Sequence, residues 1–369
     1  MKIIASNHKY KDSQILRITK KRSLFDRKNK ALVTHKKRFF DYGFGAVIDK
    51  KIIANDSFNE FKENDIVELQ DNKIYFLWEY ENDDNLFFLT ESCPHRCIMC
   101  PQPPNPHDKK LESKNIRILE LIPKHYNKSI CLTGGEPTAL GKFYLEFIAK
   151  IRQKFKHNFL ITLTGGTQFS NLNFLNKFAS IKSNSVVAIS FTSDIDTIHD
   201  KIVGKAGSFY KMHNGIYNLA KANEKIELRI VISKLNYKRL PYMADYIYRN
   251  YPFVYHIAIM GLEFTGYAES NYSQVYINPL DYTESLQKCV KKLARYNMNV
   301  SIYNIPLCLL DESIRQYATK SISKWKNTYH TICNQCGVKE FCCGVFTTSK
   351  YQYQNIKPIV ATTEERRKK

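Results

Sequence analysis

The sequence lacks long apolar runs. No stretch approaches the roughly eighteen consecutive apolar residues from which a membrane-spanning helix is built. The segment MKIIASNHKYKDSQILR (1–17) also has no apolar core followed by a small-residue cleavage site, so we expect no secretory signal peptide. We therefore expect a cytoplasmic protein that does not associate with a membrane.

Acidic side chains are scarce relative to basic ones. The 35 Asp and Glu residues face 56 Lys and Arg residues, which leaves a formal net charge of +21. Such an excess is one signature of nucleic-acid binding. Here, however, the charge is spread over the whole chain, and Lys, Asn, Ile and Tyr are abundant together. This pattern favours a solvated lysine surface, so we do not expect nucleic acid as the partner.

The fold has no need of disulfide braces, because 369 residues can bury a sizeable core. Ten cysteines are nevertheless present, three of them at 93–100 and four at 333–343. In a reducing compartment, clustered cysteines are more often metal ligands or free thiols than disulfides. Cys131 and Cys289 lie apart, and we expect them to be buried small hydrophobic residues.

Six short apolar runs alternate with segments of helical periodicity. This alternation predicts parallel strands joined by right-handed helical crossovers. Nearly every run ends in polar or glycine-containing residues, which favours the mouth of a partial (β/α)6 TIM-like barrel over the single crevice of a doubly wound sheet. The predicted strands are NLFFLT (85–90), SICLTGG (129–135), FLITLTGG (159–166), VVAISFTS (186–193), IELRIVIS (226–233) and VYHIAIMGLE (254–263).

The chain divides into three expected regions. Residues 1–84 form a small β-containing module with a very basic start and the segment DYGFGAVI, and DIVELQ and IYFLWEY joined by DNK predict a β-hairpin. Residues 85–269 are the α/β barrel. Residues 270–369 are an appended cysteine-rich region, beginning with a helix over 281–297 that Pro279 initiates.

Three cysteines, Cys93, Cys97 and Cys100, lie within eight residues directly after the first predicted strand. Three thiolates are too few for a closed zinc site. His95 or a remote residue is the alternative fourth ligand, but the short loop gives His95 little room to turn inward. A [4Fe–4S] cluster bound by three cysteines leaves one iron open to an exogenous ligand, and this is the use we infer for the missing cysteine.

The C-x3-C-x2-C spacing after the first strand, with Met99 before the last cysteine, resembles the radical S-adenosylmethionine (SAM) superfamily. The resemblance implies that the amino and carboxylate groups of SAM bind the open iron. It also implies reductive cleavage of SAM to methionine and a 5′-deoxyadenosyl radical, which abstracts a hydrogen atom from the substrate. Such chemistry belongs to the cofactors, and the protein positions them and excludes water.

LTGGEP (132–137) resembles the Gly-Gly-Glu motif of the same superfamily. The match implies that Gly134, Gly135 and Glu136 surround the methionine amino group of SAM, where the carboxylate can receive an ammonium group. The same letters also fit a simple strand-to-helix turn. Their position at the strand end that follows the cysteine loop favours the first interpretation.

Three further residues are candidates for SAM contacts. Arg229 on the fifth strand could pair with the SAM carboxylate, and Ser190 could contact the ribose. The MGLE backbone that starts at Met260 could line the adenine pocket. Arginine and serine are also common on buried strands without any such role.

The distal cysteines form a second set. Cys333, Cys336 and Cys342 follow a C-x2-C-x5-C pattern, and Cys308 is the natural fourth ligand. The pattern resembles the twitch or SPASM-like auxiliary-cluster modules of radical SAM peptide maturases, which implies a second [4Fe–4S] cluster. Tetrahedral zinc on the same thiolates is the alternative. Cys343 stands where the family usually has glycine, which leaves open which of the adjacent pair is the ligand.

Several stretches together resemble the C component of the His-Xaa-Ser radical SAM maturase system over roughly residues 60–350. The resemblance implies a peptide or small-protein substrate with His-Xaa-Ser repeats, cooperation with a second radical SAM protein, and an electron donor such as flavodoxin or ferredoxin. The stretches are CIMCPQPP, LTGGEPTALG, HDKIVGKAGSF, RIVISKLNYKRLPYMADYIYRNYPFV, IMGLEFTGYA and SISKWKNTY.

Two other functions compete with peptide maturation. A radical SAM enzyme acting on RNA is compatible with the positive charge, but no appended RNA-binding motif is visible. A metal- or redox-sensing protein without turnover would explain the cysteines but not the Gly-Gly-Glu motif. His199 and Asp200 could orient a peptide or shuttle a proton, or they cap the helix that follows.

Overall fold

The computed structural model describes residues 2–19, 30–34, 52–54, 60–181, 184–349, 351 and 353–360. The contacts divide the chain into two compact units. The first comprises Met1–Leu89, Asp108–Leu132 and Glu146–Leu160, and the second comprises Thr90–His107, Thr133–Leu145 and Ile161–Lys369. The segment DYGFGAVI and most of the basic start lie outside the described residues.

The first unit contains a four-stranded sheet, which confirms the predicted N-terminal β-structure. Its strand order is β3-β2-β1-β4, with β1 antiparallel to β4 and parallel to β2. Buried aliphatic and aromatic side chains such as Ile18, Val67 and Phe76 form its core. The strands are β1 (Ile3–Thr19), β2 (Lys30–Thr34), β3 (Ile52–Ala54) and β4 (Ile66–Trp78).

The prediction of a β-hairpin at DNK is wrong. DIVELQ and IYFLWEY belong to the single strand β4, and both halves pair with β1, Ile66 with Arg17 and Tyr75 with Ile3. Asp71 has a positive φ of 51°, and the register of the strand pair shifts on either side of its partner Tyr10. A turn-forming residue therefore produces an irregularity here, because a long partner strand is available to continue the ladder.

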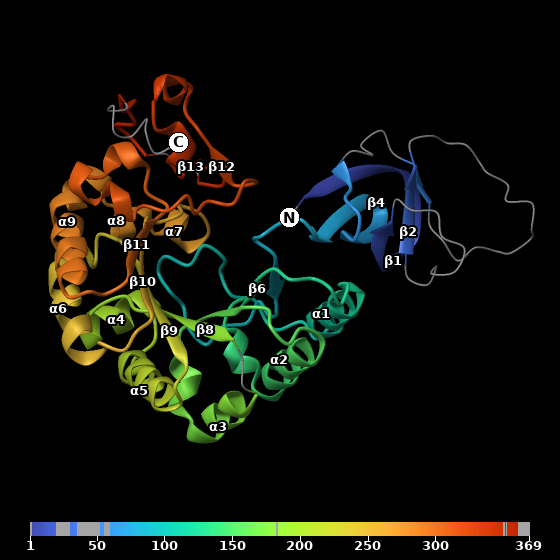
Figure 1. The fold of residues 1–369 in the computed structure, drawn as a ribbon, viewed down its shortest axis with the longest axis horizontal. Helices are drawn as coiled ribbons and strands as arrows, with labels where there is room; N and C mark the ends of the chain where they lie inside the picture. The colour runs from blue at the N-terminus through green and yellow to red at the C-terminus, as the bar shows by residue number, and fades with distance from the viewer. Residues whose placement is uncertain are drawn as a thin grey trace, which may run out of the picture. The chain divides into compact units, whose positions relative to one another are not determined.

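A second sheet has seven strands in the sequential order β5 to β11. Its pairs β8–β9, β9–β10 and β10–β11 are parallel. All six predicted strands are present, and the segment VSIYNIPLCLL adds the seventh. Figure 1 shows α3, α5, α6 and α9 along the outside of the curved strands. The strands are β5 (Leu86–Phe88), β6 (Ile130–Thr133), β7 (Leu160–Thr164), β8 (Ser185–Ser190), β9 (Lys225–Val231), β10 (His256–Met260) and β11 (Val300–Tyr303).

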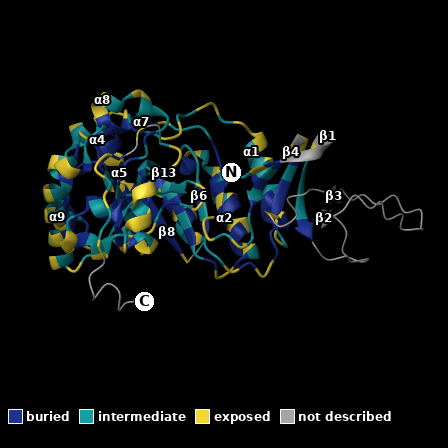
Figure 2. Cartoon of the chain, turned by 90° about the horizontal axis from the view of Figure 1, so that it is seen from above, coloured by how far each residue is buried: buried dark blue, intermediate teal, exposed yellow. Residues whose placement is uncertain are grey.

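Amphipathic helices connect these strands. Buried residues concentrate in the strands and on the inner sides of the helices (Figure 2), as expected for an apolar face of helical period. The predicted helix after Pro279 is present as α9. The helices are α1 (Lys110–Leu121), α2 (Lys142–Lys154), α3 (Leu172–Ser180), α4 (Asp196–Val203), α5 (Ser208–Lys221), α6 (Leu240–Asn250), α7 (Tyr267–Ser270), α8 (Tyr272–Val275) and α9 (Pro279–Arg295).

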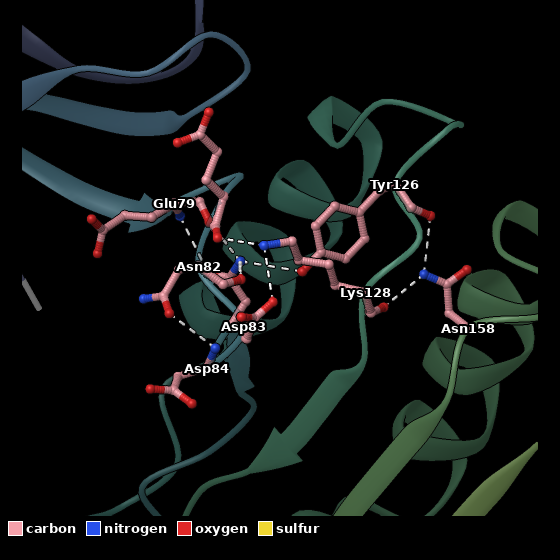
Figure 3. A network of polar contacts seen from close by, with 9 residues as sticks. Glu79, Asn82, Asp83, Asp84, Tyr126, Lys128 and Asn158 are labelled. Carbon is pink, nitrogen blue, oxygen red and sulfur yellow. Dashed lines mark hydrogen bonds and ion pairs between the residues drawn. The ribbon is translucent and has the colours of Figure 1, made fainter. Parts of the chain in front are cut away.

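A polar network holds the turn between β4 and β5 in the first unit (Figure 3). Lys128, just before β6, pairs with Asp83 at 2.9 Å and donates to the carbonyl oxygen of Glu81. The side-chain amide of Asn158 donates to the carbonyl oxygens of Tyr126 and Lys128 at 3.0 and 2.8 Å. These bonds satisfy loop backbone groups that the strands do not pair.

The C-terminal part of the chain is built mostly from short elements. The two-stranded sheet of β12 (Asn327–Thr328) and β13 (Val345–Phe346) brackets the cysteine-rich segment, and Ile322, Cys343 and Phe346 form a small core beside it. Among the described residues, no helix has the length and apolar character that crossing a membrane would require.

Candidate functional site

The proximal cysteine loop (residues 90–107) follows β5, and two other segments hold its backbone. The N–H groups of Arg96 and Ile98 donate to the carbonyl oxygens of Val203 and Ile202, at the end of α4. On the other side, the N–H of Tyr267 in α7 donates to the carbonyl oxygen of Cys100 at 2.8 Å. The cysteine backbone is therefore fixed by regular elements as well as by its own turn.

Two glycines let these elements approach the loop. Gly204 ends α4 with φ +64°, and an added Cβ would overlap the carbonyl oxygen of Arg96. Gly266 precedes α7 with φ +60°, and a Cβ there would lie 2.7 Å from the carbonyl oxygen of Cys100. Only glycine combines a left-handed conformation with such close backbone contact.

The thiols of Cys93, Cys97 and Cys100 are half-buried on this loop. Burial, with smaller contributions from the neighbouring cysteines and Glu136, raises the pKa of Cys93 to about 11 and that of Cys97 to about 12. The three sulfurs therefore lie close enough to interact electrostatically. Three soft thiolate donors on one short loop fit an iron–sulfur cluster, whose positive irons would stabilise the thiolates that burial disfavours.

The Gly-Gly-Glu segment lies against the first residues of the cysteine loop. The N–H groups of Gly135 and Glu136 donate to the carbonyl oxygens of Thr90 and Ser92 at 2.6 and 2.9 Å. A Cβ on Gly134 or Gly135 would overlap this backbone. Both glycines are therefore required by the contact with the cysteine loop, independently of any bound ligand.

The carboxylate of Glu136 is buried and extensively hydrogen-bonded. Its Oε1 accepts from the Thr138 N–H at 3.1 Å and from the hydroxyls of Thr138 and Thr164 at 2.6 Å each. Its Oε2 accepts from the Gly165 N–H at 2.7 Å. Three donors saturate Oε1, so only Oε2 retains capacity for the ammonium group expected from the sequence.

His95 is buried between the cysteine loop and α5, a placement that the sequence did not predict. Its Nδ1 lies 3.8 Å from the sulfur of Cys93, and its Nε2 lies 3.2 Å from the hydroxyl of Ser208. Burial lowers the pKa of His95, and the nearby carboxylate of Glu136 opposes the shift. His95 thus links the cysteine loop to Ser208 at the start of α5.

The remaining SAM candidates lie on neighbouring strands. Ser190, the last residue of β8, is exposed and pairs in register with Arg229 on β9. The guanidinium of Arg229 donates from Nη2 to the sulfur of Met260 at 3.4 Å. Met99 is buried in the cysteine loop. The structure thus brings Arg229 together with Ser190 and Met260.

The alternative explanation for Asp200 is confirmed, because it caps α5. Its carboxylate accepts from the N–H groups of Gly207 and Phe209 at 2.6 and 2.8 Å. His199 is buried, and its Nδ1 lies 3.0 Å from the hydroxyl of Thr192. Cys289 is buried as expected, whereas Cys131 is only half-buried.

The distal cysteines surround one cavity. Cys308, Cys333, Cys336 and Cys342 all line a pocket with about 370 Å³ of empty space, open solvent included. Backbone N–H groups point at two of the sulfurs, from Ile359 to Cys336 and from Gly344 to Cys342, both at 3.4 Å. Four thiols and N–H···S hydrogen bonds around one space fit a cysteine-bound metal centre.

The structure separates Cys342 from its neighbour Cys343. Cys343 is 2% exposed, packs in the small core with Ile322 and Phe346, and does not line the cavity. Hydrogen bonds from the Cys343 thiol and from the backbone of Gly344 lower the pKa of Cys342 to about 6, despite its burial. Cys342 is therefore the member of the pair that is prepared to be a thiolate ligand.

Neither set of cysteines converges on a single point. In the described part of the chain, no group of three or more His, Cys, Asp or Glu side chains is placed to hold one metal ion as the side chains stand. The distal sulfurs stand around their cavity.

A segment between β10 and α8 contacts both cysteine regions. Tyr267 binds the backbone of Cys100, as described above. Four residues earlier, Glu263 forms an ion pair with Lys326 at 3.1 Å, and the N–H of Phe264 donates to the hydroxyl of Ser349 at 2.9 Å. Residues 263–267 therefore connect the proximal loop with the C-terminal region.

Several solved structures resemble parts of the chain. SuiB of Streptococcus suis bound to S-adenosylmethionine is 13% identical, with a TM-score of 0.46, over 59% of this chain and 49% of SuiB. The protein anSMEcpe with bound AdoMet is 18% identical, with a TM-score of 0.46, over 59% of this chain and 60% of that protein. The chain thus spans about half the length of SuiB. No curated protein sequence matches the chain.

A family model matches the barrel region directly. Residues 87–247 match the model of the Radical SAM superfamily. This range begins in β5, includes the proximal cysteine loop and the Gly-Gly-Glu segment, and ends in α6. Residues 87–247 of the chain are therefore a radical SAM superfamily domain.

Proposed function

We propose that this protein is a radical SAM enzyme that modifies a peptide or small protein. Cys93, Cys97 and Cys100 hold a [4Fe–4S] cluster, with Met99 beside the last ligand. When bound, the cluster and SAM supply a 5′-deoxyadenosyl radical through reductive cleavage of the sulfonium. The single observation that carries the proposal is the three-thiol loop held against the Gly-Gly-Glu segment inside the matched domain.

The protein's own residues would prepare the SAM site. The Oε2 atom of Glu136 is the one carboxylate oxygen with capacity for an ammonium donor. Arg229 presents a guanidinium, which suits a carboxylate, and Ser190 and Met260 flank it for the ribose and the adenine pocket. The buried Oε1 network of Glu136 fixes the position of Oε2, so ligand binding would require little reorganisation.

For the distal site we propose an auxiliary [4Fe–4S] cluster on Cys308, Cys333, Cys336 and Cys342. Zinc on the same four sulfurs is the competing occupant. The cavity supports four sulfur ligands, which closes the site to substrate and gives it a different role from the proximal cluster. Residues 85–269 and 270–369 would then be the catalytic barrel and the auxiliary region.

The substrate class rests on the resemblance to the His-Xaa-Ser maturases. It points to a peptide with His-Xaa-Ser repeats, to a second radical SAM protein of the same system, and to flavodoxin or ferredoxin as electron donor. The stretches that carry it include HDKIVGKAGSF, which supplies Asp200 and the start of α5, and IMGLEFTGYA, which supplies the segment joining the two cysteine regions. Cytoplasmic location stays a prediction.

The experiment is anaerobic reconstitution of the full chain with iron and sulfide, followed by SAM and dithionite. We expect 5′-deoxyadenosine from the unmodified protein and none from Cys97→Ala. Cys131→Ala is the matched control, because it removes a half-buried thiol outside the cysteine loops and should keep the activity. Absence of 5′-deoxyadenosine from the unmodified protein with a full cluster would refute the proposal and favour a metal-sensing protein.

A further inference from the structure

The strands β8 to β11 carry very different side chains on their two faces. Residues paired in register share a face, so Ala188, Glu227 and His256 stand in one row across the sheet. The opposite face is aliphatic and fully buried, with residues such as Leu228, Ile257 and Ile302. The polar residues of the first face are therefore not needed to form the sheet.

Three polar residues on this face form a continuous hydrogen-bonded chain. Glu227 Oε2 lies 2.9 Å from Nδ1 of His256, and Nε2 of His256 lies 3.0 Å from the hydroxyl of Ser301. The side chain of His256 is 9% exposed and that of Glu227 is 18% exposed, so these hydrogen bonds are largely shielded from solvent. Both ring nitrogens have a partner, which fixes the orientation of the ring and, through it, that of the Glu227 carboxylate.

The second oxygen of Glu227 faces Arg229. Glu227 Oε1 lies 3.7 Å from Nε of Arg229, and the two residues lie on the same face of β9 because they are two positions apart. Nη2 of Arg229 reaches the sulfur of Met260 at 3.4 Å, and Nη1 donates no hydrogen bond to any described residue. Glu227 thus holds the guanidinium at Nε, while the N–H groups at its outer end can donate hydrogen bonds to a ligand.

The position of this outer end indicates the ligand. Arg229 is paired in register with Ser190, the last residue of β8, and contacts Met260, the last residue of β10. The carboxyl ends of parallel strands are where such sheets bind their ligands. A half-free guanidinium there suits a carboxylate in bidentate geometry.

We propose that Glu227, His256 and Ser301 are positioning residues, which orient Arg229 so that its outer edge receives the carboxylate of SAM. This inference rests on the proposed function, because it assumes that SAM binds at these strand ends. Glu227 acts through Arg229, and His256 and Ser301 act through Glu227. None of the three touches SAM.

The test compares two ligands that differ only in the carboxylate. Equilibrium dialysis with the reconstituted full chain measures the Kd of SAM and of decarboxylated SAM. Arg229→Gln should weaken SAM binding by about a hundredfold and Glu227→Gln by about tenfold, with little change for decarboxylated SAM. His256→Leu should weaken SAM binding about as much as Glu227→Gln does. His256→Asn should retain most of the affinity for SAM, because its side-chain amide can still donate to Glu227.

Glu68→Gln is the matched control. It removes the same charge from a half-buried ion pair, that with Lys114 in the first unit, and should change neither Kd. Equal weakening of both ligands in Glu227→Gln would show a merely structural role and overturn the inference, and so would unchanged binding of SAM. If the unmodified protein binds no SAM at all, the proposed function itself fails, and the positioning role fails with it.

Discussion

The two cysteine regions achieve their geometry in different ways. The proximal loop carries three thiols, and its backbone is held from outside by α4, by α7 and by the Gly-Gly-Glu segment. The distal region carries four thiols around a cavity, and N–H groups point at the sulfurs themselves. The proximal site is therefore organised as a frame of backbone contacts, and the distal site as an enclosure around its sulfurs.

The largest expected effect is on the metal content of the distal site, where substitutions of Cys342 and Cys343 should differ. Cys342→Ala should remove the distal cofactor, about four irons per chain if it is a [4Fe–4S] cluster. Cys343→Ala should keep the iron and lower the free energy of unfolding by about 1 kcal/mol, because it leaves a small cavity in the core. Iron and zinc analysis of both variants measures this. Zinc in place of iron, or metal loss from Cys343→Ala alone, would contradict the assignment.

The second prediction concerns the outer frame of the proximal loop. Gly204 and Gly207 both have φ near +70°, at +64° and +72°, but only Gly204 would press an added Cβ onto the cysteine loop. Gly207→Ala should cost about 1 kcal/mol for backbone strain. Gly204→Ala should cost about 2 kcal/mol more.

The measurement is urea unfolding together with iron content. Gly204→Ala should lose proximal iron, while the iron held by the distal site remains. Equal unfolding free energies for the two variants would show that the contact with Arg96 does not hold the loop.

The third prediction concerns the pH dependence of stability in α4, the helix whose end holds the proximal loop. Burial lowers the pKa of His199 to about 4, with Asp200 raising it and His95 lowering it. The unfolded chain protonates this residue near pH 6.5 and the folded chain does not, so stability falls as pH drops from about 6.5 towards 4. The contribution is about 2 kcal/mol between pH 7 and pH 5.

Hydrogen exchange of α4 measures the local effect. At pH 5 the amides of α4 should lose protection, and His199→Asn should flatten this part of the pH dependence. Protection in the distal segment is the internal reference. An identical pH profile for the unmodified protein and His199→Asn would rule out this residue as the cause.

The smallest expected effect is at the distal enclosure. The hydroxyl of Tyr329 donates to the carbonyl oxygen of Cys342 at 2.8 Å. Tyr329→Phe should cost about 1 kcal/mol and speed release of the distal metal to a chelator several-fold. Tyr242→Phe, at an exposed position on α6, is the control. Unchanged release would show that this bond does not tighten the enclosure.

The strand pattern of the barrel was predictable from sequence because it is local. The runs contain mostly apolar residues and end in polar ones, as in VVAISFTS, and the order along the chain equals the order in the sheet. The N-terminal hairpin was not predictable, because Asp71 is turn-forming only if no partner strand continues the ladder. The partner β1 lies more than fifty residues earlier.

That the four distal cysteines lie around one cavity was predictable from their spacing, but the hydrogen-bond networks beside the two cysteine regions were not. Nothing in the sequence shows that Glu136 Oε1 accepts hydrogen bonds from Thr138 and Thr164, since Thr164 belongs to the next strand. The chain from Glu227 to Ser301 likewise joins residues of three strands. Such contacts depend on strand register, which single-sequence patterns do not specify.

The segment 263–267 has a consequence for how the protein can be taken apart. It holds Cys100 at one end, and at the other it holds Lys326 and Ser349 from the C-terminal region. A shortened chain that lacks residues 300–360 would leave Glu263 without its ion pair and would loosen the support of Cys100. The barrel is therefore a poor candidate for expression on its own, and grafting the distal cysteines onto another protein would require this segment as well.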